Sequence, residues 1–382
     1  MYGTFGWRLA MIFQKASVFY RGQFQPLDVQ VEQDTITRIA PHLDGDEAVD
    51  CTGKLLLPGL IDLHSHGCIG YDFSTASAEE IEQMLRWYAA HGVTAVAATT
   101  MTMGIPAYRR AVAAIGCAAD KADGGSHLLG INMEGPFLGK QKKGAHDPQY
   151  LLPPQNALFE KLDALSGNRI LLVDVDPELP GAMEFIRRYS DKKVLSLAHT
   201  TCGYETANHA VDCGATHVTH LFNGMNDLGH REPGIIGMVL ERDVHAELIC
   251  DGVHIHPAVL RMMFRLCPEK LVLISDSMCA CGLQDGSYEL GGLPVTVRGR
   301  KATLADGTLA GSVTSVFDGM RNLVRFGIPI EQAVLSATLI PAKAVHLDDR
   351  FGCIEVGRAA DFLLTSPDLE LESVYLRGEK TR

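Results

Sequence analysis

Apolar, strand-like runs recur through the middle of the chain and alternate with stretches of helical periodicity. A nearly continuous apolar run is typical of a strand in a parallel sheet that is covered on both faces. The eight runs that we expect to be strands are residues 55–64, 93–100, 128–135, 169–177, 193–200, 215–220, 245–252 and 270–277. The clearest helical stretches are residues 78–92, 204–214, 256–269 and 316–327.

Eight alternating units over about 280 residues predict an α/β fold, a (β/α)8 TIM-like barrel. A doubly wound open sheet is the alternative, but no GxGxxG sequence follows the first strand-like run, which disfavours it. The glycine-rich residues 282–311 interrupt the alternation, and we expect a small hairpin and a loop near the active face. Residues 330–346 are expected to form a late helix.

The two ends of the chain have a different pattern. Residues 11–54 and 353–379 contain short alternating stretches that are typical of strands. Neither end is long enough to bury a core alone, so we expect the two to pair. We therefore predict a small β-sandwich domain built from residues 1–54 and 348–382. Residues 55–347 would form the inserted barrel.

The composition is ordinary for a globular enzyme, with 46% hydrophobic and 21% charged residues in a chain of 382. The net charge of −12, without a basic run, argues against nucleic acid as a partner. An anionic substrate would have to be held by a local cluster of Arg and His. Ten scattered Cys indicate reduced thiols in the cytoplasm and not a disulfide framework.

No apolar run reaches the roughly 18 residues needed to cross a bilayer, so we expect no membrane partner. The first 13 residues, MYGTFGWRLAMIF, have too short an apolar core for a signal peptide. We expect residues 1–10 to be a leader or an upstream start.

Imidazoles and carboxylates stand at the ends of the predicted strands. The carboxyl ends of barrel strands meet at one rim, where chemistry occurs. His64 and His66 are two residues apart and so share a strand face. The residues at or just after strand ends are His64, His66, Glu134, His199, His220, Asp251, His254 and Asp276. Taken singly, Glu134 could cap a helix and either His199 or His220 could be a core residue, but together they predict a metal site.

Eight motifs occur in order along the chain: PGLIDLHSHG, MEGPF, LAHT, THLFNGM, REPG, DGVHIHP, ISDSM and GTLAGS. Over nearly the whole chain they resemble the N-acetylglucosamine-6-phosphate deacetylases of the amidohydrolase superfamily. The resemblance implies a divalent metal, Zn or Fe, held by Glu134, His199 and His220. Some members have Gln-x-Asn in the first motif and need one ion. Here His64 and His66 would add a second ion, together with Glu134 and Asp276.

The resemblance also implies roles for other residues. Asp276 would be the general base and later the acid, and His146 would assist the metal in stabilising the oxyanion. Arg231 and His254 would clamp a phosphate, one of them from a second subunit of a homodimer. The remaining substrate contacts would be Ala145, Asn223, Gly224, Leu309, Ala310 and Gly311.

Several alternatives stay open. Related cyclic-amide hydrolases carry a modified Lys at the end of strand four, and the sequence LLVDVDPE has none there, which argues against them. Phe222, Gly224 and GLQDG at residues 282–286 also occur in N-acetylgalactosamine-6-phosphate deacetylases, so the epimer is open. A different metal-dependent N-acyl amidohydrolase would not need the Arg231 and His254 pair. A non-catalytic scaffold would not need Asp276 or a full set of ligands.

Overall fold

The structure is a computed structural model that describes residues 10–45, 47–121 and 124–382. The leader expected over residues 1–10 therefore lies outside the described residues, except for residue 10. Among the described residues, no helix combines the length and the apolar character that a membrane-spanning helix requires.

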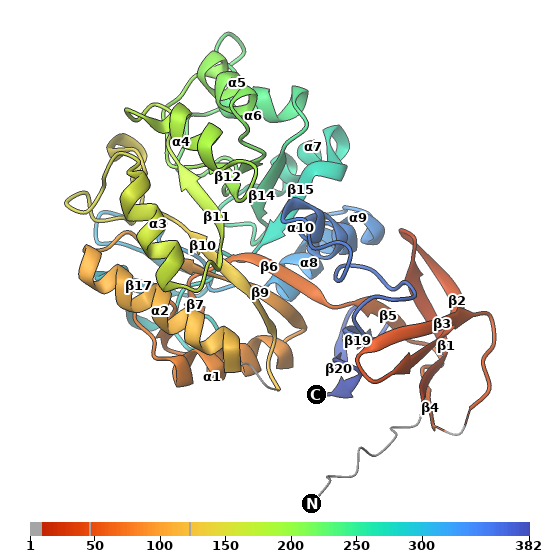
Figure 1. Cartoon of the computed structure of the whole chain (residues 1–382). Coiled ribbons are helices and arrows are strands. Elements are labelled where there is room, and N and C mark those ends of the chain that lie inside the picture. Colours follow the sequence, from red (N-terminus) through yellow and green to blue (C-terminus); the bar gives the residue numbers. More distant parts are fainter. Residues whose placement is uncertain (1–9, 46, 122–123) are drawn as a thin grey trace, which may run out of the picture.

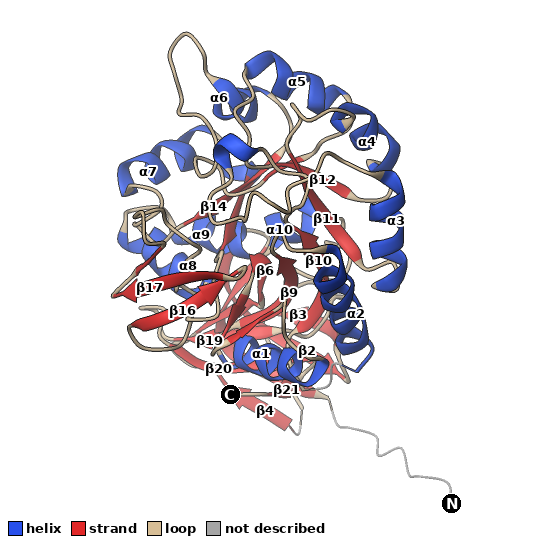
Figure 2. Cartoon of the chain, turned by 90° about the vertical axis from the view of Figure 1, so that its left-hand side faces the viewer, coloured by secondary structure: helices blue, strands red, loops and turns tan. Residues whose placement is uncertain are grey.

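A parallel eight-stranded sheet forms the centre of the larger domain (Figures 1 and 2). Each strand pairs with the next one along the chain, which is the order of a (β/α)8 barrel. In order, the strands are β6 (Leu60–Ser65), β9 (Val93–Thr100), β10 (His127–Met133), β11 (Ile170–Val175), β12 (Val194–Leu197), β13 (His217–Val218), β14 (His245–Ile249) and β15 (Leu271–Ile274). The predicted barrel is confirmed.

The first and last strands meet just beyond their ends and nearly close the barrel. The Asp276 amide donates to the His64 carbonyl over 2.9 Å, and the His66 amide donates to the Ser277 carbonyl over 2.8 Å. Two segments that carry predicted site residues are thus held side by side at the carboxyl rim.

Helices surround the sheet on the outside, as Figure 2 shows. A cluster of buried apolar side chains fills the space between the helices and the strands. The helices that follow the eight strands are α1 (Ala78–Ala90), α2 (Ile105–Lys121), α3 (Asn156–Leu165), α4 (Ala182–Tyr189), α5 (Tyr204–Asp212), α6 (Gly234–Glu241), α7 (Pro257–Leu266) and α8 (Val316–Arg325). Short 3-10 helices occur at Lys140–Lys142 and Pro268–Lys270.

The late helix expected over residues 330–346 is two helices, α9 (Ile330–Ala337) and α10 (Leu339–Ala344), separated by Thr338. Pro341 explains the break, because its ring would clash with the carbonyl of Ala337 in a continuous helix. Side chains of α10 pack with residues of β6 and β15 and help to close the barrel core.

The single strand predicted over residues 55–64 is wrong. The structure has two strands there, β5 (Leu55–Pro58) and β6, separated by Gly59. β5 pairs with β1 and β19 in the smaller domain, whereas β6 pairs with β9 in the barrel. Pro58 lacks the N–H that a continuous central strand would need, so the chain can leave one sheet and enter the other at this point.

The smaller domain is one mixed sheet built from both ends of the chain, apart from the barrel in Figure 1. The two ends share a core in which the Phe13 ring lies edge-on to Phe362 and Tyr375, with centroids 5.2 and 4.7 Å apart. Its strands are β1 (Met11–Tyr20), β2 (Gln23–Glu32), β3 (Thr35–Ala40), β4 (Glu47–Asp50), β5, β19 (Phe362–Thr365), β20 (Leu371–Leu376) and β21 (Glu379–Lys380).

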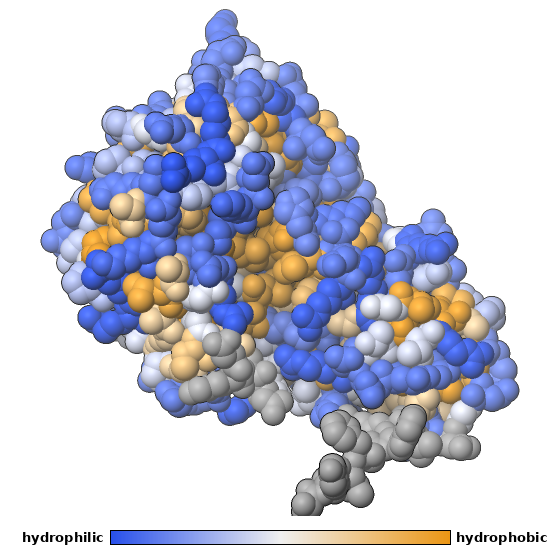
Figure 3. Space-filling model, in the orientation of Figure 1, coloured by the Kyte–Doolittle hydropathy of each residue, from blue (hydrophilic) through white to orange (hydrophobic). Residues whose placement is uncertain are grey.

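One face of the molecule has an exposed apolar area. Figure 3 shows hydrophobic residues gathered near the middle of this face, with smaller hydrophobic patches toward the left and on the smaller domain, among mainly hydrophilic residues.

Two further small sheets extend the barrel. The glycine-rich segment after β15 forms a three-stranded antiparallel sheet, one strand more than the expected hairpin: β16 (Gly286–Leu290), β17 (Leu293–Arg298) and β18 (Lys301–Thr303). The loop that follows β18 reaches the site described below. After β6, the strands β7 (Gly67–Cys68) and β8 (Tyr71–Asp72) form a short hairpin.

Candidate metal centre and substrate cavity

Glu134, directly after β10, is the point on which the predicted ligands converge. Its Oε1 lies 3.1 Å from His199 Nε2 and 3.0 Å from His220 Nε2. Its Oε2 lies 3.2 Å from His66 Nε2 and 3.5 Å from His146 Nε2. All of these residues are buried. Side chains from different strand ends therefore meet at one carboxylate.

The orientations of His199 and His220 are fixed from behind. His199 Nδ1 donates to the Lys142 carbonyl over 2.7 Å, and His220 Nδ1 donates to the Asn223 carbonyl over 3.1 Å. A carbonyl only accepts, so in the neutral rings the Nε2 atoms carry lone pairs. These two Nε2 atoms are 3.1 Å apart and face a carboxylate oxygen. Three lone-pair atoms that face one another without a shared proton are suited to bind a cation. Two imidazole nitrogens and a carboxylate oxygen are typical ligands of Zn²⁺ or Fe²⁺.

A second group of donors lies on the other side of Glu134. His66 Nε2 is 3.3 Å from Asp276 Oδ1. His64 Nε2 is 3.6 Å from the same oxygen and 3.7 Å from Glu134 Oε1, and it has no hydrogen-bond partner. His64, His66 and Glu134 form one buried set of potential metal donors, and Glu134, His146 and His199 form another. Glu134 belongs to both sets.

The buried carboxylates of the cluster favour positive charge beside them. Burial alone would raise the pKa of Glu134, but the facing imidazoles of His64 and His146 hold it well below its usual range. Burial opposes protonation of His66, yet Asp276 and Glu134 raise its pKa to about 9. The carboxylates thus attract either protons on imidazoles or a metal cation, and a divalent ion supplies the same charge at the convergence point.

A cavity of about 230 Å³ opens beside this cluster. Most of the predicted substrate residues line it, while Ala310 is buried in the adjacent apolar cluster instead. The lining residues are Glu134, Gly144, Ala145, His146, His199, His220, Asn223, Gly224, His254, Asp276, Thr308, Leu309 and Gly311. The cavity is therefore bordered by the metal-type residues on one side and by loops after β10, β13 and β18 on the other.

Of the two residues predicted to bind the phosphate, only His254 lies at the cavity. His254 lines the cavity, and its Nδ1 donates to Asp251 Oδ2 over 2.8 Å. Arg231 does not line the cavity within this chain. It is exposed on the loop before α6, where its guanidinium contacts His230 Nε2 at 2.6 Å. No Lys or Arg is among the described residues that line the cavity.

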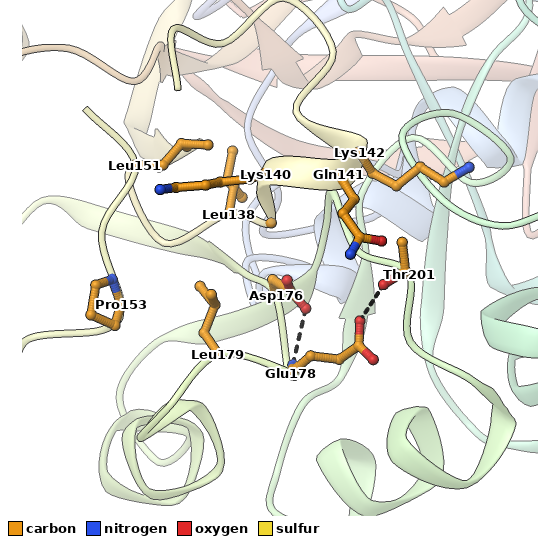
Figure 4. A pocket seen from close by; sticks show the side chains of 11 residues that line it. Leu138, Lys140, Gln141, Lys142, Leu151, Pro153, Asp176, Glu178, Leu179 and Thr201 are labelled. Carbon is orange, nitrogen blue, oxygen red and sulfur yellow. Dashed lines mark hydrogen bonds between the residues drawn. The ribbon is translucent and has the colours of Figure 1, made fainter. Parts of the chain in front are cut away.

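A larger cavity of about 510 Å³ is lined in part by the short 3-10 helix Lys140–Lys142, whose last carbonyl orients His199 (Figure 4). The side chains of Lys140 and Lys142 leave this segment in opposite directions, and Glu178 accepts a hydrogen bond from Thr201 over 2.6 Å. None of its eleven described lining residues is a histidine. The chemistry therefore belongs to the smaller cavity.

Several residues that shape the site were not predicted from the sequence. The Lys142 carbonyl orients His199, the Thr102 amide donates to His146 Nδ1 over 3.3 Å, and Glu247 contacts His64 Nδ1 at 3.0 Å. Only Glu247 left a signal, because an acid interrupts an otherwise apolar strand. The backbone contacts depend on loop paths that no residue pattern reveals.

A model of the amidohydrolase family matches residues 55–380. N-acetylglucosamine-6-phosphate deacetylase of Vibrio furnissii is 36% identical over 355 residues, covering 91% of this chain and 88% of that protein. The Bacillus subtilis protein of the same name is 38% identical over 332 residues, covering 85% of this chain and 84% of that protein.

The fold is also similar to a solved structure from Mycobacterium smegmatis, with a TM-score of 0.91 and 30% identity, covering 98% of this chain and 100% of that one. That structure is a mutant of N-acetyl-D-glucosamine-6-phosphate deacetylase in complex with N-acetyl-D-glucosamine-6-phosphate.

Proposed function

Because the chain belongs to the amidohydrolase family, we propose that it hydrolyses N-acetylglucosamine-6-phosphate to glucosamine-6-phosphate and acetate, in amino-sugar catabolism. The observation that carries the proposal is the convergence of His66, His199 and His220 on Glu134 at the rim of the barrel. The identity with named deacetylases over most of the chain supports the substrate.

The residues divide the work of amide hydrolysis. A divalent ion, Zn²⁺ or Fe²⁺, bound by the Glu134 cluster would lower the pKa of a water toward ~7 and polarise the acetyl carbonyl. Asp276, at the cavity wall, accepts the proton of the attacking water. The carbon–oxygen bond forms first and places negative charge on the former carbonyl oxygen. The carbonyl then re-forms as the carbon–nitrogen bond breaks, and Asp276 returns the proton to the leaving amine. His146 donates to the oxygen that becomes negatively charged.

Asp276 is suited to begin as a base. Burial alone would raise its pKa, but the His66 and His64 imidazoles lower it below its usual value. The carboxylate is therefore ionised at neutral pH, as the first proton transfer requires. Asn223, Gly224 and the loop of Leu309 to Gly311 hold the sugar through hydrogen bonds and contact.

The phosphate needs a cation that the cavity of one chain does not supply. We assign His254 of this chain and Arg231 of a second copy to it, which makes the active form a homodimer. The position of Arg231 on an exposed loop supports a contact across subunits.

A cytoplasmic location is part of the same proposal. All ten cysteines are free thiols in the described structure, as in proteins of reducing compartments.

The experiment that tests the function is acetate release from three substrates, with metals quantified on the same sample. The substrates are N-acetylglucosamine-6-phosphate, its galacto epimer and unphosphorylated N-acetylglucosamine. We expect the highest kcat/KM for the first. A preference for the galacto epimer would assign the chain to the N-acetylgalactosamine-6-phosphate deacetylases, and equal rates without phosphate would indicate another N-acyl amidohydrolase.

A further inference from the structure

Glu247 is a carboxylate in the middle of β14, flanked by the buried Ala246 and Leu248. It is fully buried, with 0% of its surface exposed. An ionised carboxylate in the interior costs several kcal/mol unless hydrogen bonds compensate it. Its contacts therefore indicate what it does.

Three N–H groups converge on Glu247. Oε2 accepts from His64 Nδ1 over 3.0 Å and from the His220 amide over 3.1 Å. Oε1 accepts from His217 Nε2 over 3.1 Å. One side chain thus connects β6, β13 and β14, and it touches two predicted ligands from the side that faces away from the cavity.

The hydrogen bond between His64 Nδ1 and Glu247 determines which nitrogen of the His64 ring can bind a metal ion. A neutral imidazole with its proton on Nδ1 carries its lone pair on Nε2. That Nε2 is buried without a hydrogen-bond partner and faces Glu134 Oε1 and Asp276 Oδ1 at 3.7 and 3.6 Å. An orphaned acceptor beside two carboxylates is suited to a cation.

We propose that Glu247 is a positioning residue that makes His64 a metal ligand, and that a second divalent ion on the His64 and His66 side of Glu134 requires it. A carboxylate behind a ligating imidazole fixes the ring and raises its basicity. The inference deepens the proposed function, because it concerns the same metal centre. It is independent of which amide the centre hydrolyses.

Glu247→Gln is the sharpest variant. The amide oxygen can still accept from His64 Nδ1 and the His220 amide, so the shape and the backbone bond are kept. The negative charge behind His64 is lost, and His217 must accept from the new NH2 group through its other tautomer.

The readout is the zinc content per chain, measured by elemental analysis in a chelator competition. We expect two ions per wild-type chain and a 10- to 100-fold weaker affinity for one of them in Glu247→Gln. The absorption spectrum of the cobalt-loaded chain should lose the contribution of one site. Asp174→Asn is the control, because Asp174 is an equally buried acid on β11 that accepts a hydrogen bond from Thr219 and makes none with a histidine ring. Both ions should stay in that variant.

A double-mutant cycle separates positioning from general damage. His64→Gln should lose the same ion, and adding Glu247→Gln to it should cost no further affinity, because the two residues act through one bond. Additive losses would contradict a role through His64.

A measurement on the wild-type chain covers the case in which Glu247→Gln does not fold. Nitrogen-15 histidine NMR, assigned with His64→Gln, should find the proton of His64 on Nδ1. A proton on Nε2, one zinc ion per wild-type chain, or an unchanged affinity in Glu247→Gln would each overturn the inference. Absence of deacetylase activity with these metal results intact would overturn only the proposed substrate.

Discussion

At the scale of single residues, the backbone of the site stands out. His199, His220 and Asp276 have φ values of 43°, 28° and 48°. Residues other than glycine rarely adopt this left-handed backbone conformation, and each instance costs about 1–3 kcal/mol of conformational free energy. All three follow barrel strands, so the chain turns sharply where it presents a polar side chain to the rim. The surrounding structure maintains this strain, which is typical of functional sites.

The role of Asp276 predicts a separation of turnover from metal binding. Asp276→Asn keeps the shape but cannot accept the proton of water, so kcat should fall by about 10²- to 10⁴-fold. The ion held by Glu134, His199 and His220 should remain bound, because these three residues are unchanged. The measurement is acetate release beside elemental analysis. Near-normal turnover in this variant would exclude Asp276 as the base.

At the scale of elements, the junction of β5 and β6 is constrained by a close contact. A Cβ on Gly59 would lie 2.0 Å from Thr94 Oγ1 on β9. Gly59→Ala should therefore lower the free energy of unfolding by about 1–3 kcal/mol, through overpacking. Gly286→Ala is the control, because the nearest atom to its Cβ is a Tyr288 ring carbon at 3.4 Å. Thermal unfolding compares the two, and equal midpoints would show that the strands adjust freely.

A histidine of β14 also makes the stability of the fold depend on pH. Burial and the neighbouring His217 lower the pKa of His245 to about 4, below the 6.5 of an unperturbed histidine. Between these values the unfolded chain binds more protons than the folded one, so stability falls as pH falls through this window. From pH 7.5 to 5 the loss should be about 2 kcal/mol.

The variant His245→Gln should lack this part of the loss. Urea unfolding at both pH values measures the difference between the two chains. If both lost equal stability on acidification, His245 would not be the group responsible.

At the scale of the whole molecule, the position of Arg231 predicts complementation between subunits. Arg231→Ala and Asp276→Asn should each be nearly inactive alone. In a mixture that exchanges subunits, half of the dimers are mixed, and one site in each would contain both residues. Activity should then recover to about a quarter of the wild type.

The matched control is a mixture of Asp276→Asn with His146→Ala, two residues that line the cavity of the same chain. In a mixed dimer each site would still lack one of the two, so activity should stay low. Failure of the Arg231→Ala mixture to recover, with mixed dimers demonstrated by mass spectrometry, would place Arg231 in its own subunit's site or outside any site.

The sequence by itself determined the barrel, because long apolar runs separated by helical stretches have few other stable arrangements. It also determined the chemical residues at strand ends, because parallel strands bring their carboxyl ends to one rim. Glu134, His199 and His220 could therefore be placed together before any coordinates.

Only the tertiary structure decided how that rim is held. Gly59 divides an apolar run between two sheets, and the Lys142 and Asn223 carbonyls orient the ligand rings. Glu247 reaches His64 from a strand 183 positions away in the chain. Such contacts depend on the relative positions of loops and strands, which local patterns of polarity do not encode. Residue type therefore fixed which groups are present, and packing fixed which atom of each group faces the cavity.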